Sequence, residues 1–304
     1  VPVDGLLKSI RMTSLLDPNR LKRQYASDKL DRDIVEAREK YTVPPTDFVS
    51  WALNSVRWQG NESVLDVGCG YGQYYDKVMA RIPDGSYYGV DLFAGTMSSH
   101  PAQRSRLAVG DAVALPYPSG VFDVVMANHM LYHVADIDSA LVEIRRVLKP
   151  NGVLMATTHS VQTMPEVRSL LRRAVIILTQ QPPSAVRMPL TASDLFGLEN
   201  GTRMLSRHFY AVARSELPTT MIFSTAEPLM QYMNALRDMI ELYLPPDVSW
   251  ELVLDVVNDQ VVQLLSQWGD LPISRLAGVL VASDHGDFIH DFLARRAQAR
   301  GEAV

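Results

Sequence analysis

A short stretch of the chain, residues 64–72, combines a carboxylate with three closely spaced glycines. Asp66 follows an apolar pair, and Gly68, Gly70 and Gly72 come just after it. The apolar residues suit a buried parallel strand, and the glycines let the next turn come close to a ligand. The stretch therefore predicts a small-molecule cradle between a strand and a helix.

The spacing of the glycines indicates which ligand the cradle suits. A dinucleotide fingerprint, G-x-G-x-x-G, would need a third glycine where Gln73 stands. The carboxylate of Asp66 would also repel the phosphates of a dinucleotide, whereas it would attract a ligand that carries an ammonium group. The cradle is therefore expected to hold a cationic small molecule and not NAD.

Two further acids end predicted strands. Asp91 closes the apolar run 87–92, about 20 residues beyond the glycine turn, where an acid can accept both hydroxyls of a ribose. Asp111 closes the run 107–112, and its carboxylate can accept hydrogen bonds. The structural alternatives are a helix N-cap for Asp91 and a loop cap for Asp111.

Three histidines follow the next predicted strands: His129 and His133 after residues 121–128, and His159 after residues 153–158. An imidazole has a pKa suited to general-base chemistry near neutrality. Histidines in such turns also commonly bond the backbone or neighbouring loops. The sequence does not rank the three as candidate catalytic bases.

The elements that must position these side chains alternate between strand and helix from residue 64 to residue 158. This alternation predicts a doubly wound parallel sheet with right-handed crossovers. A short helix is expected at 94–101, a sixth strand beginning at 211–215, and a last, antiparallel strand at 276–282. Residues 166–180 and most of 227–268 are expected to be helical, and Asp17-Pro18 is a plausible helix start.

Residues 25–160 resemble the class I S-adenosylmethionine-dependent methyltransferases, and most closely those that tailor natural products. The resemblance rests on Val-Leu-Asp-Val-Gly-Cys-Gly-Tyr-Gly at 64–72 and on the acids that end the following strands. It implies a Rossmann-like α/β core and S-adenosylmethionine as cofactor, with S-adenosylhomocysteine as product.

The resemblance also assigns cofactor-binding roles by position. Asp66, Gly68 and Gly70 would hold the methionine part, Asp111 would reach the adenine amino group, and the backbone N–H of Ala112 a ring nitrogen. The remaining cofactor-binding residues implied by position are Asp91, Leu92, Asn128 and Tyr25. Tyr25 would cover the cofactor from an N-terminal lid, unless it is an ordinary half-buried residue of an amphipathic helix.

The predicted domain organisation has three parts. Residues 1–58 form an N-terminal helical lid, residues 59–160 and 205–304 form the cofactor-binding core, and residues 161–204 and 226–270 form helical cap insertions over the substrate site.

Composition narrows the class of protein. A net charge of −5 gives no basic footprint for nucleic acid, and 47% hydrophobic with 21% charged residues is ordinary for a globular protein. The single cysteine, Cys69, excludes a disulfide framework and a cysteine metal cluster, so no metal is expected. No apolar run reaches the roughly 18 residues that a membrane span needs, and a cytoplasmic protein is expected.

The predicted function is methyl transfer to nitrogen or oxygen of a small-molecule acceptor. Residues 226–270 hold one base, Arg237, against the acids Glu227, Asp238, Glu241, Asp247, Glu251, Asp255, Asp259 and Asp270. Their summed field could attract a cationic amine or amino sugar, such as an aminoglycoside intermediate in antibiotic biosynthesis. The bland interpretation of these acids is a set of solvated helix faces.

Other functions stay open at this point. They are an O-methyltransferase of a neutral or phenolic metabolite, an RNA or protein methyltransferase, and a non-catalytic cofactor-binding scaffold. The acceptor, the base and the oligomeric state are not fixed by the sequence.

Overall fold

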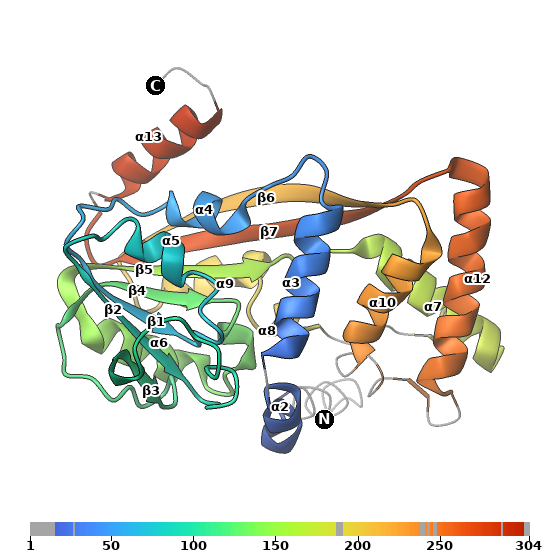
Figure 1. Ribbon diagram of the computed structural model, residues 1–304, viewed down its shortest axis with the longest axis horizontal. Helices are drawn as coiled ribbons and strands as arrows, with labels where there is room; N and C mark the ends of the chain where they lie inside the picture. Colours follow the sequence, from blue (N-terminus) through green and yellow to red (C-terminus); the bar gives the residue numbers. More distant parts are fainter. Residues whose placement is uncertain are drawn as a thin grey trace.

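The computed structural model describes residues 16–300 apart from 27, 187–190, 238–240, 242–243, 246–247 and 287. The first part of the predicted lid and the acids Asp238 and Asp247 therefore lie outside the described residues. Within them, one sheet runs in the order β3-β2-β1-β4-β5-β7-β6 (Figure 1). Its strands are β1 (Ser63–Val67), β2 (Ser86–Asp91), β3 (Leu107–Val109), β4 (Phe122–Asn128), β5 (Leu148–His159), β6 (Ala211–Phe223) and β7 (Leu271–Ser283).

The strand directions confirm the predicted doubly wound fold. The pairs among β1 to β5 are parallel, whereas β7 is antiparallel to both β5 and β6. The central strand β4 is a continuous buried run from Val124 to Asn128, as expected for a parallel strand covered on both faces. The order reverses between β1 and β4, and ligands of open sheets bind at the strand ends beside such a reversal.

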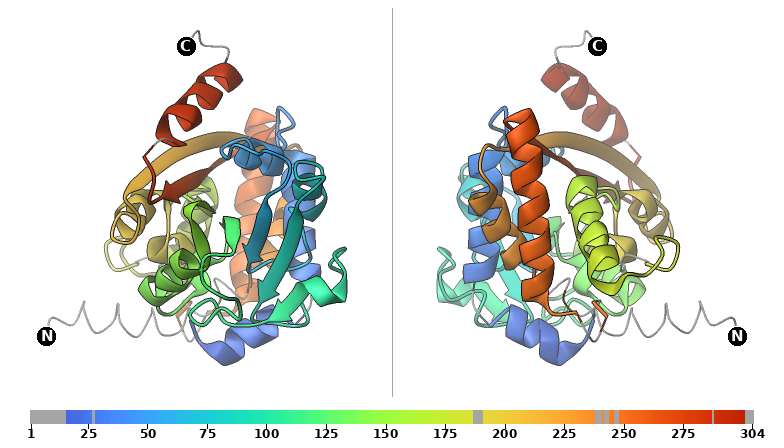
Figure 2. Two further views of the ribbon diagram at one scale, coloured as in Figure 1. Left: turned by 90° about the vertical axis from the view of Figure 1, so that its left-hand side faces the viewer. Right: turned by 90° about the vertical axis from the view of Figure 1, so that its right-hand side faces the viewer.

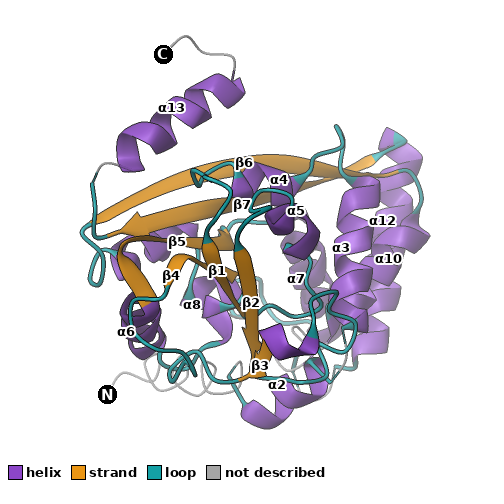
Figure 3. Ribbon diagram, turned by 60° about the vertical axis from the view of Figure 1, so that its left-hand side comes forward, coloured by secondary structure: helices purple, strands orange, loops and turns teal. Residues whose placement is uncertain are grey.

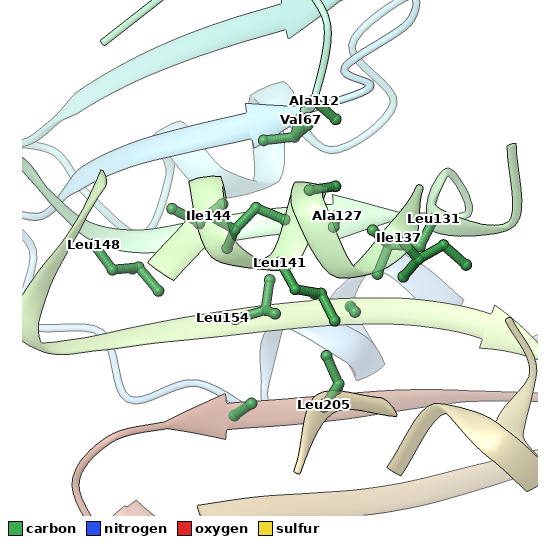
Figure 4. Close-up of a cluster of buried hydrophobic side chains, with 14 of the residues drawn as sticks. Val67, Ala112, Ala127, Leu131, Ile137, Leu141, Ile144, Leu148, Leu154 and Leu205 are labelled. Carbon is green, nitrogen blue, oxygen red and sulfur yellow. The ribbon is translucent and has the colours of Figure 1, made fainter. Parts of the chain in front are cut away.

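Helices cover both faces of the sheet. On one face lie α6 (Ile137–Val147) and α9 (Leu198–Leu205), and on the other α4 (Phe48–Leu53), α5 (Tyr75–Met79) and α13 (Phe288–Arg300). Figure 4 shows the first layer, where Leu141 and Ile144 of α6 point toward the strands. Both are fully buried, and such burial is worth about 1.5–3 kcal/mol for each side chain.

The strands β6 and β7 extend well past the sheet as a two-stranded ribbon, made of residues 217–223 and 271–277. In this part they pair with each other, and β5, which pairs with β7 from Ala277 to Ala282, meets the ribbon only at Ala277. Around the ribbon pack α3 (Lys29–Tyr41), α7 (Pro165–Thr179), α10 (Ala226–Ala235) and α12 (Trp250–Trp268). The side view in Figure 2 shows α12 between α10 and α7, and Figure 3 shows the group from another angle.

The first described helix is α2 (Pro18–Gln24). It begins as the sequence indicates, because the carboxylate of Asp17 accepts from the backbone N–H of Asn19 and of Arg20, and Pro18 takes the first helical position. Tyr25 ends the helix. The short elements α8 (Ala192–Leu195), η1 (Arg104–Arg106) and η2 (Leu131–His133) complete the described structure.

Two expectations about elements need correction. The predicted helix at 94–101 is wrong, because residues 94–99 form successive turns. Pro101 disfavours helical geometry at His100, and a side chain at Gly95 would collide with the backbone of Ala26. The last strand begins at Leu271 and not at residue 276, because its first half pairs with β6 beyond the sheet.

None of the helices in the described part of the chain is long and apolar enough to cross a membrane.

Candidate active site

A cavity of about 1030 Å³ lies at the carboxyl ends of the parallel strands and continues beneath the ribbon. Pockets that hold small ligands usually measure about 300–1,000 Å³, so this one has room for two. The structure places every predicted site residue on its lining: Tyr25, Asp66, Gly68, Gly70, Asp91, Leu92, Asp111, Ala112, Asn128, His129, His133 and His159.

The glycine turn is shaped by positive φ angles. Gly68 has φ 70° and donates to the carbonyl of Val90 at 2.7 Å, and a Cβ there would lie 2.7 Å from that of Met130. Gly70 has φ 51°, but a Cβ there would meet nothing within 4 Å. Gly68 is therefore required by packing, while Gly70 leaves its backbone open to the cavity.

Asp66 carries an unused acceptor. Its buried carboxylate accepts from the Tyr87 hydroxyl at 2.9 Å through Oδ2, whereas Oδ1 is buried and has no partner among the described residues. Burial, together with the nearby charge of Asp91, raises the pKa of Asp66 to about 7. A buried acceptor of this kind, facing a cavity, suits a cationic donor group of a ligand.

Asp91 is held in a fixed orientation by the backbone. Its Oδ2 accepts from Gly70 N at 3.0 Å, and its Oδ1 from Phe93 N at 2.9 Å. Burial raises its pKa, against the effect of these bonds. Each oxygen keeps lone-pair capacity for a hydroxyl donor. The helix N-cap alternative is wrong, since turns and not a helix follow.

The loop after β3 shows the capping contact that the sequence left open. Asp111 is exposed, and its Oδ1 accepts from Val113 N at 3.1 Å, while Ala112 is buried. At the end of β4, Asn128 accepts from the Thr157 hydroxyl at 3.2 Å, and its buried Nδ2 has no partner in the described part of the chain. The loop after β3 and the end of β4 thus both present polar groups to the cavity.

The predicted lid is joined to the loop after β4 through Tyr25. Its hydroxyl lies 2.7 Å from Nε2 of His133, and its ring stacks on Phe93 with the centroids 5.9 Å apart. Phe93 was missed by the sequence analysis, although an aromatic residue two positions after the strand-end acid Asp91 was a signal. Burial and Arg20 lower the pKa of His133 to about 4, so its imidazole is neutral at pH 7.

The other two histidines form a stacked pair. The rings of His129 and His159 lie 4.5 Å apart, and both Nδ1 atoms are buried without a partner among the described residues. Burial, and then Arg38 and Arg275, lower the pKa of His129 to about 3, and that of His159 falls well below its ordinary value. Both are neutral at physiological pH, and their ring nitrogens can accept hydrogen bonds.

The two arginines of this end of the cavity were also missed. Arg38 on α3 donates to the Tyr232 hydroxyl at 3.1 Å, and Arg275 lies on β7. They are far apart in the sequence, so only the fold brings them together. The signal in the sequence that could have pointed to Arg275 was its place as a lone arginine just before the apolar run 276–282.

The acidic residues of the predicted cap do not reach the cavity where the structure describes them. Glu241 and Glu251 form ion pairs with Arg237, and Asp270 accepts from Ser224. The remaining described acids, Glu227, Asp255 and Asp259, are exposed. The described acids of residues 226–270 therefore match the structural alternative, in which they lie on solvated helix faces. Among the residues described, no group of three His, Cys, Asp or Glu could hold a metal ion.

Comparison with known proteins finds a known domain in this chain. Residues 65–156 match the model of a methyltransferase domain. A malonyl-[acyl-carrier protein] O-methyltransferase of Methylovorus sp. is 33% identical over 37% of this chain and 42% of its own length. A demethylmenaquinone methyltransferase of Symbiobacterium thermophilum is 36% identical over 30% of this chain and 40% of its own length. The chain thus spans less than half the length of either relative.

Solved structures share the fold at low identity. A crystal structure from Anabaena variabilis, described as a methyltransferase from an antibiotic biosynthesis pathway, aligns with a TM-score of 0.53 at 13% identity, over 77% of this chain and 96% of the other. Phosphoethanolamine N-methyltransferase 2 of Haemonchus contortus aligns with a TM-score of 0.51 at 17% identity, over 89% of this chain and 60% of the other.

The donors and acceptors of the cradle also fit the cofactor of such enzymes. The unpartnered Oδ1 of Asp66 suits an ammonium group, the fixed carboxylate of Asp91 suits a pair of hydroxyls, and the open space at Gly70 admits a ligand against the backbone. The methyltransferase domain matched at residues 65–156, the strand order and this fit are all similar to those of class I S-adenosylmethionine-dependent methyltransferases.

Proposed function

We propose that this protein transfers the methyl group of S-adenosylmethionine to a nitrogen or oxygen atom of a small-molecule acceptor. The observation that carries the proposal is the continuous cavity, which joins the glycine turn and its acids to the His129–His159 pair beneath the ribbon. One end suits the cofactor, and the other end has volume and polar groups for an acceptor.

S-adenosylmethionine, when bound, supplies a methyl group that its positively charged sulfur already activates for displacement. The residues of this chain would then bind and orient. We assign the ammonium group to Asp66 and the glycine turn at Gly68 and Gly70, and the ribose hydroxyls to Asp91 with Leu92 beside it. We assign the adenine to Asp111 and the backbone of Ala112.

Two further residues complete the proposed cofactor site. The donor Nδ2 of Asn128 faces the cavity without a partner in the described structure, and so it suits an acceptor atom of the cofactor. Tyr25, fixed by His133 and Phe93, would cover the cofactor from the lid. The lid, core and caps remain our proposed division of the chain.

Among the histidines, the geometry favours His129 and His159 for contact with the acceptor. His133 already lies within hydrogen-bond distance of Tyr25, whereas the Nδ1 atoms of the other two are unpartnered among the described residues. A pKa near 3 makes His129 a weak base, so we assign it to accept a hydrogen bond from the nucleophile and hold it in line. Such orientation can contribute on the order of 7–11 kcal/mol.

An amine acceptor, as in amino sugars, is the finer form of this proposal. The acidic cap no longer supports it, because its described members lie away from the cavity. The arginines supply a different argument. A positive field lowers the pKa of a nearby amine, as it does for His129, and so favours the neutral form that has a lone pair for attack.

Calorimetric titration with S-adenosylmethionine and S-adenosylhomocysteine tests the first half of the proposal. The loaded protein is then incubated with amines, amino sugars, phenols and carboxylic acids, and methylated product is measured by mass spectrometry. We expect tight binding of both compounds and turnover of at least one acceptor class. Absence of cofactor binding would overturn the proposal, and binding with no turnover of any class would favour a scaffold.

A further inference from the structure

Arg275 interrupts an otherwise apolar face of β7. The alternate residues Leu271, Ile273, Ala277 and Val279 point to the same face as Arg275, and all four are buried. Leu271 and Ile273 belong to the core around the ribbon, and Val279 to the core of the sheet. Packing of this face calls for an apolar side chain at position 275, and a cation stands there instead.

The charge of Arg275 is not balanced by the described residues. None of their acids forms an ion pair with it, and the groups that act on it are Arg38, which is repulsive, and Tyr232. Glu39 also lines the cavity, yet it makes no ion pair with Arg275. Burial and then Arg38 lower the pKa of Arg275 to about 10, so it remains charged at pH 7. A desolvated, unpaired cation is costly to a fold.

Several groups that can donate hydrogen bonds lie around Arg275. Thr219 is its direct partner across the ribbon and lines the same cavity. Arg38 lies nearby and is fixed by its bond to Tyr232, at 3.1 Å. The neutral His129 and His159 lie close enough for both arginines to lower their pKa values. The result is a concave positive site beside the proposed methyl acceptor.

We propose that Arg275, with Arg38 beside it, binds an oxyanion of the acceptor, a carboxylate or a phosphate, at the ribbon end of the cavity; this inference rests on the proposed function. A guanidinium matches the planar oxygen pair of such groups with two parallel hydrogen bonds. The oxyanion supplies the missing countercharge, and it orients the rest of the acceptor toward the strand ends. The acceptor class is thereby narrowed to small molecules that carry an acidic group.

Fluorine NMR with three probes tests this subsite: para-fluorobenzoate, para-fluorophenyl phosphate and the uncharged para-fluorobenzamide. Each is titrated at constant ionic strength into the protein, with and without S-adenosylhomocysteine. We expect at least one anion to bind and the amide to bind at least about tenfold more weakly. Which anion binds better separates a carboxylate-bearing acceptor from a phosphate-bearing one.

The variants are Arg275→Met, Arg275→Lys and Thr219→Glu, with Arg207→Met as the matched control. Arg207 is a half-exposed arginine that pairs with Asp138 outside the cavity. Arg275→Met should lose anion binding at least about tenfold and raise Tm, because a partly buried charge without an ion pair among the described residues is replaced by an apolar side chain. Thr219→Glu should block the anion by placing a carboxylate opposite Arg275. Arg275→Lys should bind anions with intermediate affinity, and Arg207→Met as the wild type does.

The outcomes separate this inference from the proposed function. Unchanged affinity for S-adenosylhomocysteine in all variants shows that the cofactor end is intact. If the wild type fails to bind S-adenosylhomocysteine, the proposed function fails, while the anion titration without it still reports on Arg275. Equal binding of the amide and the anions, or anion binding retained by both Arg275→Met and Thr219→Glu, overturns the oxyanion subsite.

Discussion

At the scale of single residues, Asp66 should make cofactor binding dependent on pH. Its pKa is raised to about 7 by burial, and a bound cation stabilises its charged form. Below pH 7 the carboxyl group is protonated, and binding must remove that proton. Affinity for S-adenosylhomocysteine should therefore rise by about tenfold for each pH unit below 7 and level off above it. Calorimetry from pH 5.5 to pH 8.5 measures this slope.

The matched variant for this prediction is Asp66→Asn, which keeps the shape and cannot titrate. It should bind S-adenosylhomocysteine weakly and with a much flatter dependence on pH over that range. A wild-type affinity that does not change between pH 5.5 and pH 7 would contradict the role assigned to Asp66.

Removal of the Asp91 carboxylate should weaken cofactor binding strongly. Hydrogen bonds to a charged group are worth about 1.5–3 kcal/mol, so Asp91→Ala should lower affinity for S-adenosylhomocysteine by about 10- to 150-fold. Asp138→Ala is the control, because Asp138 is an exposed acid that pairs with Arg207 and His208. Equal affinities of the two variants would refute the ribose assignment.

Residue types near strand ends were readable from the sequence, whereas contacts through space were not. Asp66, Asp91 and Asn128 reach one cavity because parallel strands end at one edge of a sheet. The stacking of His129 on His159 depends on how two loops meet, and the approach of Arg38 to Arg275 depends on where α3 packs. No local pattern encodes either juxtaposition.

At the scale of elements, the glycine turn offers a test that separates backbone strain from ligand contact. Gly70 and Gly120 both have positive φ, and a Cβ at either would meet nothing within 4 Å. Substitution of either glycine by alanine should therefore lower the free energy of unfolding by about 1–2 kcal/mol. Only Gly70 lines the cavity, so only Gly70→Ala should also weaken S-adenosylhomocysteine binding. Chemical denaturation and calorimetry on both variants measure the two effects, and equal cofactor affinity in both would contradict this account.

The lid should act through its hydrogen bond to the core. Tyr25→Phe removes the hydroxyl that lies 2.7 Å from Nε2 of His133, a contact worth about 0.5–1.5 kcal/mol. We expect a two- to tenfold loss of S-adenosylhomocysteine affinity by calorimetry. Tyr41→Phe is the control, because Tyr41 packs on Phe223 at the ribbon through its ring. A Tyr25→Phe protein with wild-type affinity would show that this hydrogen bond does not hold the lid over the cofactor.

Element boundaries show what the sequence could not specify. Periodicity and turn residues located the parallel strands, because buried strands need unbroken apolar runs. The ribbon was missed because Arg275, Ser274 and Pro272 break the apolar pattern of β7. This segment still forms a strand because its backbone pairs with β6. The turns at 94–99 were mistaken for a helix because composition alone does not show that Gly95 must pack against Ala26.

At the scale of the whole molecule, two bodies of apolar packing meet at one cavity. The sheet and its helices bury one set of side chains on each face, while the ribbon, α3, α7, α10 and α12 bury a separate set. The glycine turn belongs to the first body, and Arg38 and Arg275 belong to the second. Occupation of the two ends of the cavity should therefore stabilise different parts of the chain.

Hydrogen exchange can resolve these two effects. A ligand at about 100 times its Kd stabilises the folded state by about 2.7 kcal/mol, and local protection reports where it acts. S-adenosylhomocysteine should protect residues 64–72, 91–93 and 18–25, and addition of the better-binding fluorinated anion should extend protection to α3 and to residues 217–223 and 271–277. In Arg275→Met the second effect should vanish while the first persists. Full protection of the ribbon by S-adenosylhomocysteine alone would instead mean that the cavity responds as one rigid unit.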